Sequence, residues 1–267
     1  MYNTLMNISL VDLHTDAITE LSPEDFAKFI KNAAKCGVSA ISVSVWTTEM
    51  QNPMEQIRRY KQQIAGLKTT VKLLLHIEDA WFVNEQNIDE FIGFKPYSVG
   101  IVWNENNNLA GGAFGNGDVT PLGETVIRKL VKNGVKVDLA HLNRKSFFST
   151  AKILQNLGQK LLCTHTCFAE INSHPRNLDR EQVQTIVNSG GVVGLTLVGD
   201  FLTANKTATQ SDVLAHINYF RENFPTGNLA FGTDFYGTKN LPSGIKNYND
   251  LQKFISTHKI TLQNPPG

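Results

Sequence analysis

The sequence predicts an α/β fold, a single (β/α)8 barrel of the TIM type with its active site at the C-terminal ends of the strands. Eight short runs of aliphatic and β-branched residues alternate with eight longer amphipathic stretches. Such alternation indicates a parallel sheet with crossover helices. The 267 residues also suit eight βα units in one domain, residues 1–267. A doubly wound open sheet is the rival architecture for the same alternation.

Each expected element follows from its hydrophobic period. Strands are expected in the short apolar runs, at 8–13, 40–46, 71–77, 98–103, 135–140, 161–164, 192–198 and 229–232. Helices are expected in the amphipathic stretches, at 23–35, 53–67, 85–92, 123–133, 144–156, 179–189, 210–223 and 248–257. The glycine- and asparagine-rich segment 104–118 has little periodicity and is expected to be a long surface loop.

Capping residues support these boundaries. Ser22 precedes Pro23, which predicts an N-cap followed by proline at the first helical position. Asp179 with Gln182 three residues later resembles a capping box. Gly134 follows a predicted helix, where glycine can adopt the left-handed conformation that ends it.

Composition and charge exclude several classes of protein. The apolar fraction of 41% and the net charge of +1 argue against a disordered chain and against a nucleic-acid binder driven by bulk charge. The longest apolar stretch, 190–198, is too short to span a bilayer, and the N-terminus lacks a basic leader. Three cysteines do not indicate a disulfide scaffold. A soluble cytoplasmic protein without a membrane or nucleic-acid partner is therefore expected.

Metal-binding residue types follow five of the predicted strands. In a barrel of this kind, side chains at the C-terminal ends of the strands meet at one mouth. These residues are three histidines and three carboxylates: His14, Asp16, Glu78, His141, His165 and Asp234. Such a set suits zinc or a similar divalent ion. Two ions about 3.5–4 Å apart, with a bridging carboxylate and a bridging hydroxide, would use all six.

Each of these residues also has an ordinary structural explanation when taken alone. A histidine at a strand end is usually a hydrogen-bonded structural residue, and an aspartate there often caps the next helix. His14 and Asp16 are two positions apart, so on a strand both would point to one face. The metal hypothesis therefore depends on the joint placement of the set at several strand ends.

Other tempting residues have simpler interpretations. Cys163 and Cys167 flank His165 at spacing two, but a buried free cysteine commonly behaves as a small hydrophobe. His76 lies two residues before Glu78 and suits packing or support of that ligand. His216 lies on a predicted helix and is expected to face solvent.

The ordered motifs resemble those of the renal (membrane) dipeptidases, zinc peptidases of the amidohydrolase-like barrels. The resemblance extends from about residue 12 to residue 237. Its segments are Asp-Leu-His-Thr-Asp at 12–16, Ile-Glu at 77–78, Val-Asp-Leu-Ala-His at 137–141, Thr-His-Thr at 164–166, His-Pro-Arg-Asn-Leu-Asp at 174–179, Gly-Gly-Val-Val-Gly at 190–194 and Gly-Thr-Asp-Phe-Tyr-Gly at 232–237. The His-Pro-Arg-Asn-Leu segment shortly after Thr-His-Thr is the most specific part of this set.

The resemblance implies a role for each matched residue. His14 and Asp16 would bind one zinc, and His141 and His165 the second. Glu78 would bridge the two ions. Manganese or cobalt could replace zinc at such ligands.

The same resemblance assigns the groups that would act on the substrate. Asp234 would hold and deprotonate the bridging water, as general base and then general acid. Arg176 would pair with the terminal carboxylate of the substrate, for which a guanidinium is well shaped. Taken alone, Arg176 in a loop before a helix would be a surface ion pair.

The chain departs from the family pattern at three places, and one of them is Leu13 in the first motif, where glycine is common. The family often has a histidine after the fourth strand that contacts the scissile carbonyl, and Trp103-Asn104 occupies that place here, so both are expected to line the substrate site. Asp79 follows Glu78 where glycine is usual, and its charge could alter metal affinity or substrate choice.

The resulting expectation is a zinc-dependent dipeptidase that hydrolyses small dipeptides with a hydroxide bridging two zinc ions. The alternatives are a dizinc hydrolase of another small amide, such as a β-lactam or an N-acyl amino acid, and a non-catalytic metal-binding barrel. A metal-free barrel acting through a carboxylate pair would not need three histidines at strand ends. A homodimer is possible by analogy with relatives.

Overall fold

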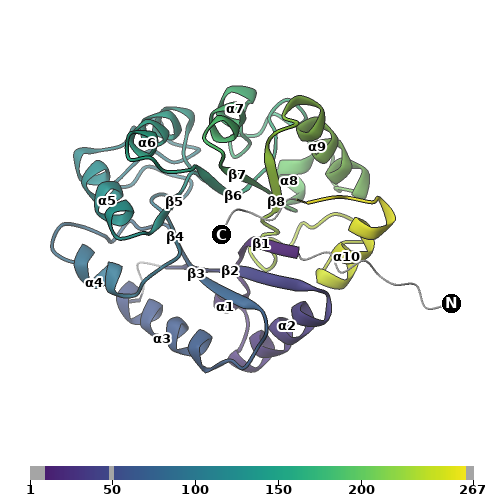
Figure 1. Ribbon diagram of the computed structural model, residues 1–267, viewed down its shortest axis with the longest axis horizontal. Coiled ribbons are helices and arrows are strands. Elements are labelled where there is room, and N and C mark those ends of the chain that lie inside the picture. The colour runs from purple at the N-terminus through teal and green to yellow at the C-terminus, as the bar shows by residue number, and fades with distance from the viewer. Residues whose placement is uncertain (1–9, 48–50, 263–267) are drawn as a thin grey trace.

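The computed structural model describes residues 10–47 and 51–262, and these residues form a closed barrel of eight parallel strands. The strands form a ring in chain order, β1 to β8, and the helices lie outside this ring (Figure 1). The last strand pairs with the first between Phe231 and Asp12, which closes the sheet. The predicted (β/α)8 barrel is therefore confirmed, and an open sheet is excluded.

The elements follow one another in the order strand then helix. The strands are β1 (Leu10–Thr15), β2 (Val38–Trp46), β3 (Lys72–Glu78), β4 (Ser98–Gly100), β5 (Lys136–Asp138), β6 (Leu162–Thr166), β7 (Val192–Leu195) and β8 (Asn228–Phe231). The helices are α1 (Ala17–Glu20), α2 (Pro23–Lys35), α3 (Pro53–Gly66), α4 (Ile88–Gly93), α5 (Pro121–Lys132), α6 (Arg144–Asn156), α7 (Arg180–Asn188), α8 (Gly199–Leu202), α9 (Gln210–Asn223) and α10 (Tyr248–Thr257).

All the predicted elements are present, and α2, α6, α9 and α10 have the predicted bounds. The short helices α1 and α8 were not predicted, because a single helical turn is too short to show a period of 3.6 residues. The predicted first strand begins at residues 8 and 9, which lie outside the described residues. This strand continues past the predicted end to Thr15.

The predicted caps are also present. Ser22 accepts a hydrogen bond from the backbone N–H of Asp25 at the start of α2. Asp179 and Gln182 form the expected capping box at the start of α7. These bonds satisfy backbone donors that the first turn of a helix leaves free.

The segment 104–118 packs onto the C-terminal end of the barrel, although it contains no helix and no named strand among its described residues. Leu109 and Ala110, which belong to this segment, are buried. Asn143 donates from its side chain to the backbone oxygen of Gly117, and the backbone N–H of Gly111 donates to Ser146. The loop is therefore fixed to the start of α6.

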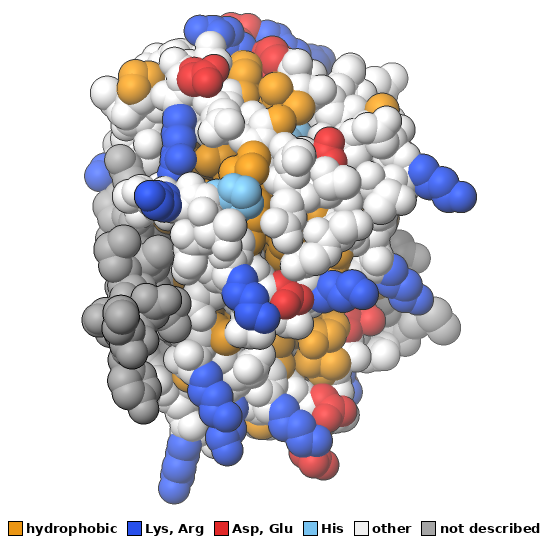
Figure 2. Space-filling view, turned by 90° about the vertical axis from the view of Figure 1, so that its right-hand side faces the viewer, with side chains coloured by type: hydrophobic (Ala, Val, Ile, Leu, Met, Phe, Trp, Pro, Cys, Tyr) orange, Lys and Arg blue, Asp and Glu red, His pale blue; other side chains and the backbone are white. Residues whose placement is uncertain are grey.

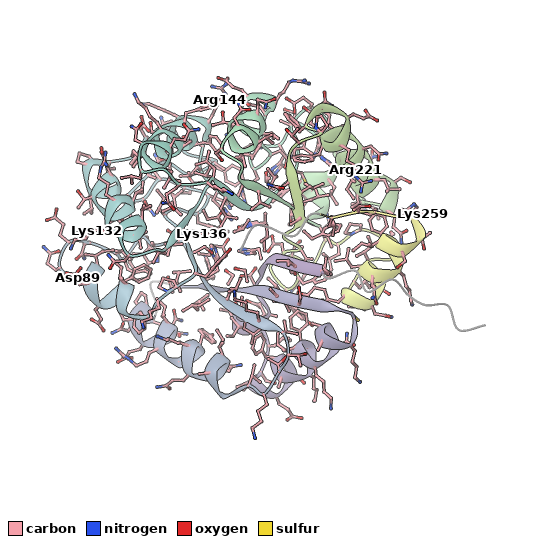
Figure 3. All side chains as sticks on the ribbon, viewed as in Figure 1. Asp89, Lys132, Lys136, Arg144, Arg221 and Lys259 are labelled. Carbon is pink, nitrogen blue, oxygen red and sulfur yellow. The ribbon has the colours of Figure 1, made fainter. Side chains whose placement is uncertain are left out.

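The outer surface is polar and mixed in charge. Charged side chains such as Asp89, Lys132, Arg144, Arg221 and Lys259 lie on or beside the outer helices (Figure 3). The face in Figure 2 shows lysine and arginine side chains mixed with carboxylates and small apolar patches. No helix of the described residues is both long and apolar enough to cross a membrane.

Candidate metal centre

The six residues singled out at the strand ends converge at one end of the barrel. His14 lies in β1, Glu78 ends β3 and His165 lies in β6. The other three follow strand or helix boundaries: Asp16 precedes α1, His141 follows β5, and Asp234 follows β8. The imidazoles, Asp16 and Glu78 are buried, and the side chain of Asp234 is 13% exposed.

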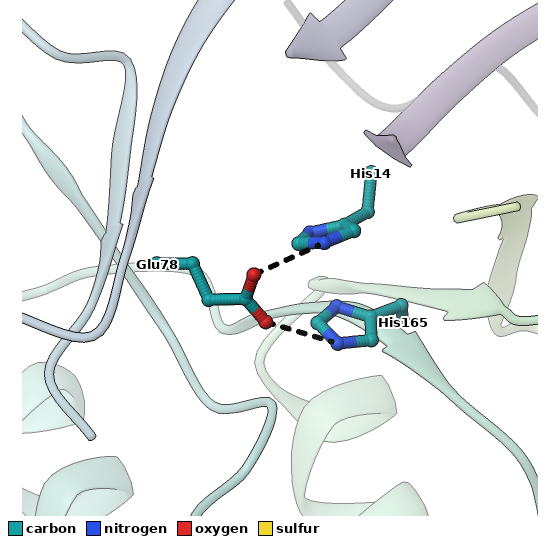
Figure 4. Close-up of side chains that lie close together, drawn as sticks. All are labelled: His14, Glu78 and His165. Carbon is teal, nitrogen blue, oxygen red and sulfur yellow. Dashed lines mark ion pairs between the residues drawn. The ribbon is translucent and has the colours of Figure 1, made fainter. Parts of the chain in front are cut away.

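The two carboxylate oxygens of Glu78 face different histidines. Glu78 Oε2 lies 3.6 Å from His14 Nε2. Glu78 Oε1 lies 2.8 Å from His141 Nε2 and 3.7 Å from His165 Nε2. Figure 4 shows Glu78 between His14 and His165, with one oxygen directed to each ring. Ser44 donates to Glu78 Oε2 and helps to hold this orientation.

Asp16 reaches the centre by a different route from the one expected. It does not lie on the strand with His14, because β1 ends at Thr15 and Asp16 is the N-cap residue of α1. The prediction that strand alternation aligns the two residues was therefore wrong. Asp16 makes no side-chain cap bond, and its Oδ2 lies 3.6 Å from His14 Nε2.

Several polar atoms in this cluster are buried without a hydrogen-bond partner. They include both ring nitrogens of His14 and Oδ1 of Asp16. Burial of an unpaired polar atom is costly, so such atoms call for an explanation. Two groups of residues each bring three potential ligand atoms to within 4.8 Å of one another. One group is His14, Glu78 and His165, and the other is His14, Asp16 and Asp234. The donor types and the unpaired atoms both fit divalent metal ions.

Two hydrogen bonds orient His141 and His165 for ligation. Asn104 Oδ1 lies 3.0 Å from His141 Nδ1, and a carbonyl oxygen can only accept, so Nδ1 carries the proton. Thr164 Oγ1 donates to Asp138 at 2.5 Å and therefore accepts from His165 Nδ1 at 2.8 Å. Both imidazoles are neutral in this tautomer, and each directs the lone pair of its Nε2 atom into the cluster. The two Nε2 atoms lie 2.9 Å apart.

Another buried carboxylate, Asp12, joins β1 to the segment after β8 and to α10 beside the centre. Asp12 accepts from the backbone N–H and the hydroxyl of Thr233, at 2.8 and 2.6 Å. Tyr248 of α10 donates to the same carboxylate at 2.7 Å. Because Thr233 precedes Asp234, and His14 is two residues after Asp12, this network fixes both strand ends at the cluster.

Charge interactions strongly shift the protonation of the cluster. Burial disfavours a charged His14, but Glu78, Asp16 and Asp234 outweigh it and raise the pKa of His14 to about 10. Burial and the neighbouring Asp16 raise the pKa of Asp234 well above its usual range. Burial and Arg176 lower the pKa of His141 to about 4. The metal-free centre is therefore expected to hold protons on His14 and Asp234 at neutral pH.

Arg176 is buried rather than placed in a surface ion pair. It is 3% exposed, and no carboxylate of the described residues lies within ion-pairing distance. One guanidinium nitrogen lies 3.0 Å from His165 Nε2, while Nε has no partner. The guanidinium stacks over Phe201, with 5.4 Å from Cζ to the ring centroid. A buried cation with free donor capacity suits an anionic group of a ligand.

A cavity of about 410 Å³ opens above the cluster. Its lining includes the candidate ligands other than His14, together with Asp234 and Arg176. Trp103 and Asn104, expected at the substrate site, also line it. Asn104 in addition holds His141, a contact that the sequence did not reveal.

Asp79 turns away from this cavity. Its Oδ1 accepts from the side chain of Asn107 at 2.9 Å and from the backbone N–H of Trp81 at 3.2 Å. Burial raises the pKa of Asp79 to about 6. The carboxylate therefore shapes the turn after β3 and does not line the cavity.

The remaining candidates have structural surroundings. Burial raises the pKa of the Cys163 and Cys167 thiols well above the usual range, which disfavours the thiolate that a metal would need. His76 contacts the Ser98 hydroxyl at 2.8 Å. The expectation that His216 faces solvent was wrong, because it is fully buried and contacts the backbone of Leu202 and Phe168.

Gly237 gives the two acidic residues their position. A Cβ atom at residue 237 would stand 2.1 Å from Asp234 Oδ1 and 2.2 Å from Asp16 Oδ2. Gly237→Ala is expected to displace both carboxylates and to weaken zinc affinity by about 10- to 100-fold. Competition with a chelating dye measures this affinity.

Gly66→Ala is the matched control for Gly237→Ala. No atom lies within 4 Å of a Cβ at this last residue of α3, so zinc affinity should not change. Equal affinities of Gly237→Ala and the wild type would show that the carboxylates do not contribute to metal binding.

The chain is similar to proteins of a known family. The family model of membrane dipeptidases (peptidase family M19) matches residues 3–258. A Klebsiella pneumoniae protein described as uncharacterized, from the region 5′ of pqqA, is 28% identical over 199 residues, which cover 69% of this chain and 72% of that protein.

Two solved structures show the same fold. A metallopeptidase of family M19, described as dipeptidase AC, has a TM-score of 0.80 at 17% identity and covers 95% of this chain and 92% of its own. A metallopeptidase from Rhodobacter sphaeroides, solved with a phosphinate mimic of the dipeptide L-Ala-D-Ala, has a TM-score of 0.77 at 16% identity, with coverages of 94% and 92%.

Proposed function

Since the chain belongs to the membrane dipeptidase family, peptidase family M19, we propose that it hydrolyses small dipeptides at a centre that holds two zinc ions. Membership in this family identifies a hydrolase of the metallopeptidase class. Two ions per chain, zinc in place of manganese or cobalt, and dipeptides as substrates go beyond what family membership gives.

The observation that best supports a two-ion centre is the orientation of Glu78. One of its oxygens faces His14 and the other faces His141 and His165. A carboxylate between two separate ligand sets is the arrangement expected of a bridging ligand. His14 and Asp16 would hold one ion, and His141 and His165 the other.

Two ions in this centre would supply a water acidified to a pKa of about 7 and a Lewis acid for the amide carbonyl. The protein contributes the remaining functions. Arg176 binds the terminal carboxylate of the substrate through its free donor capacity and so fixes the amide above the cluster. Asp234, which lines the cavity beside the candidate ligands, would take the proton of that water and pass it to the departing amine, as general base and then general acid.

Substrate length follows from the position of Arg176. Its guanidinium contacts His165, so a carboxylate bound there lies close to the candidate metal ligands. Only a short segment fits between that carboxylate and the scissile amide. The proposal therefore restricts the enzyme to dipeptides, and the dipeptide mimic bound by the Rhodobacter sphaeroides protein suggests testing a C-terminal D-residue as well.

The experiment combines elemental analysis with turnover. Purified protein is assayed with L,L- and L,D-dipeptides before chelation, after chelation and after zinc is restored. About two zinc ions per chain, with activity that follows the metal, would support the proposal.

Two outcomes would contradict this function. Two metals without turnover of any dipeptide would favour another small amide, such as a β-lactam or an N-acyl amino acid, with Trp103 in place of the family histidine as the reason. Absence of bound metal, with no gain on adding it, would reject the metal centre itself.

The raised pKa of His14 predicts proton release when the metal-free protein takes up zinc. His14 has a pKa of about 10 without metal, so its imidazole is protonated at pH 7 and must lose that proton to ligate. Calorimetric titration at pH 7 in buffers of different ionisation enthalpy should detect about one proton or more released per chain. Zinc affinity should rise with pH over the same range.

The same shift fixes the pH dependence of metal-free stability. The protonated His14 contributes to the free energy of unfolding of the metal-free protein. This contribution is fully present below the pKa of about 6.5 that His14 has in the unfolded chain, and it is lost as the pH rises toward its folded-state pKa of about 10. For the zinc titration, His258→Gln is the control. This histidine is exposed, so its replacement should not change the number of protons released on zinc uptake. Zinc uptake without proton release would contradict the prediction.

A further inference from the structure

Large apolar side chains gather at the end of the barrel that holds the candidate centre. Exposed apolar residues that cluster, rather than occurring singly, usually mark a binding surface. The large hydrophobic residues that are more than a third exposed, among the described parts of the chain, all follow or end a strand at this end: Trp46, Trp103, Phe114, Ile171 and Tyr236.

Trp46 and Trp103 form one continuous aromatic surface inside the cavity. Their ring centroids lie 5.8 Å apart, with the planes at 53°. The ring of Trp103 lies 6.0 Å from that of His141, at 31°. Trp46 is 38% exposed and Trp103 is 40% exposed, and both line the cavity. The surface therefore extends from a candidate metal ligand along the cavity wall, and more than a third of each tryptophan is exposed.

The place of Trp46 in the closed ring of strands shows which part of a bound dipeptide would reach the tryptophans. Trp46 ends β2, and Arg176 follows β6, which stands four strands away in the closed ring of eight. The two therefore lie on opposite sides of the mouth, with the Glu78 cluster between them. A dipeptide whose carboxylate is held by Arg176 and whose amide lies over the cluster must extend its N-terminal residue toward the tryptophans.

The other walls of the cavity are less suited to an apolar group. Glu20 and Lys239 bring charge to the side near β1 and β8. Phe201 is apolar, but the guanidinium of Arg176 and the ring of His174 already stack on it. Tyr236 packs edge-on against Phe29, 5.4 Å away. The two tryptophans contact each other and His141, and they offer two adjacent, partly exposed rings on one wall of the cavity.

We propose that Trp46 and Trp103 form the binding surface for the side chain of the N-terminal residue of the substrate and select a large apolar, preferentially aromatic, side chain there. This inference rests on the proposed dipeptidase function. Stacking between aromatic rings adds to the burial of apolar area. Replacing glycine by phenylalanine at this substrate position should therefore raise kcat/KM by about 10- to 100-fold.

The experiment compares Gly-Ala, Ala-Ala, Leu-Ala and Phe-Ala as substrates of the zinc-loaded enzyme. The ratio of kcat/KM for Phe-Ala to that for Gly-Ala is the measured quantity. It should fall toward one in Trp103→Ala and in Trp46→Ala, and Trp103→Phe should retain much of it. Trp81→Phe is the matched control, because Trp81 packs on Phe82 outside the cavity lining and should preserve the ratio.

A binding measurement separates this inference from the function on which it rests. Phosphinate analogues of Phe-Ala and Gly-Ala are titrated into zinc-loaded Trp81→Phe, in which Trp46 and Trp103 are the remaining tryptophans, and fluorescence is followed. The phenylalanine analogue should bind about 10- to 100-fold more tightly and quench the emission.

The outcomes are distinguishable. Turnover of every dipeptide with a ratio near one would overturn the selection by tryptophan and leave the dipeptidase function intact. Absence of turnover with any dipeptide would reject the function, and equal binding of the two analogues would then reject the aromatic surface as well.

Discussion

Replacing Asp234 with asparagine is expected to lower kcat for a dipeptide by about 10²- to 10⁴-fold while zinc content stays near the wild-type value. A carboxylate at this position can take up a proton and release it again, and an amide cannot exchange one. Asp234 has a left-handed backbone, with φ of 58°, a conformation that asparagine tolerates well. The backbone should therefore be preserved, and the loss should report the missing proton transfer.

Asp79→Asn provides the matched control. Asp79 also follows a strand, with φ of 62°, but its carboxylate bonds to Asn107 and lies outside the cavity. Its kcat should stay within a few-fold of the wild type. If Asp234→Asn instead loses zinc together with activity, Asp234 acts as a metal ligand, and a kcat within tenfold of the wild type would exclude it as the proton carrier.

Arg176→Met is expected to lower kcat/KM by about 30- to 5,000-fold for dipeptides with a free carboxylate, because removing one partner of a buried charge pair costs about 2–5 kcal/mol. Arg176 is buried with an unpaired Nε and meets no carboxylate of the described chain at ion-pairing distance. The substrate would supply the missing anion. The measurement compares Ala-Ala with its C-terminal amide in the wild type and the variant.

The variant should lose the discrimination between acid and amide that the wild type shows. Arg180→Met is the control, since Arg180 begins α7, bonds Asn223 at the surface and should change neither substrate. An equal loss for the acid and the amide would mean that Arg176 supports the protein structure and does not bind the carboxylate.

The barrel could be predicted because its elements have strong local signals. Helix α2 carries an N-cap serine, a first-turn proline and a regular apolar face, so its bounds follow from the sequence. Helix α1 lacks those signals because it is a single turn between β1 and α2. Its existence depends on the packing of Ala17 and Ile18 in the core, which no local pattern reveals.

The candidate ligands could be predicted for a similar reason. Barrel strands bring their C-terminal ends together, so residue type at a strand end is enough to nominate His14, Glu78 and His165. Their partners could not be found this way. Asp138 orients His165 through the hydroxyl of Thr164. Asp138 can do so only because β5 pairs with β6, which the sequence alone does not show.

The roles of the Trp46–Trp103 surface and of Gly237 could not be predicted from the sequence, because they depend on contacts that exist only in the folded barrel. Trp46 ends β2, where an apolar residue suggests core packing, and only the closed ring places it beside Trp103. Gly237 follows a predicted strand as many loop glycines do. Its importance lies in the two carboxylates that occupy the space of a side chain.

The Asp12 network has a consequence for how the protein is made. Asp12 and Thr233 are 221 residues apart in the chain, and their bond joins the first strand to the last. During synthesis the ribosome has made His14 long before Asp234 exists, so a nascent chain holds only fragments of the centre. Such distant pairing is formed late in folding and slows it. We expect metal to enter only after the segment that carries Thr233 and Asp234 has left the ribosome, which a pulse of labelled zinc on stalled nascent chains of increasing length would test.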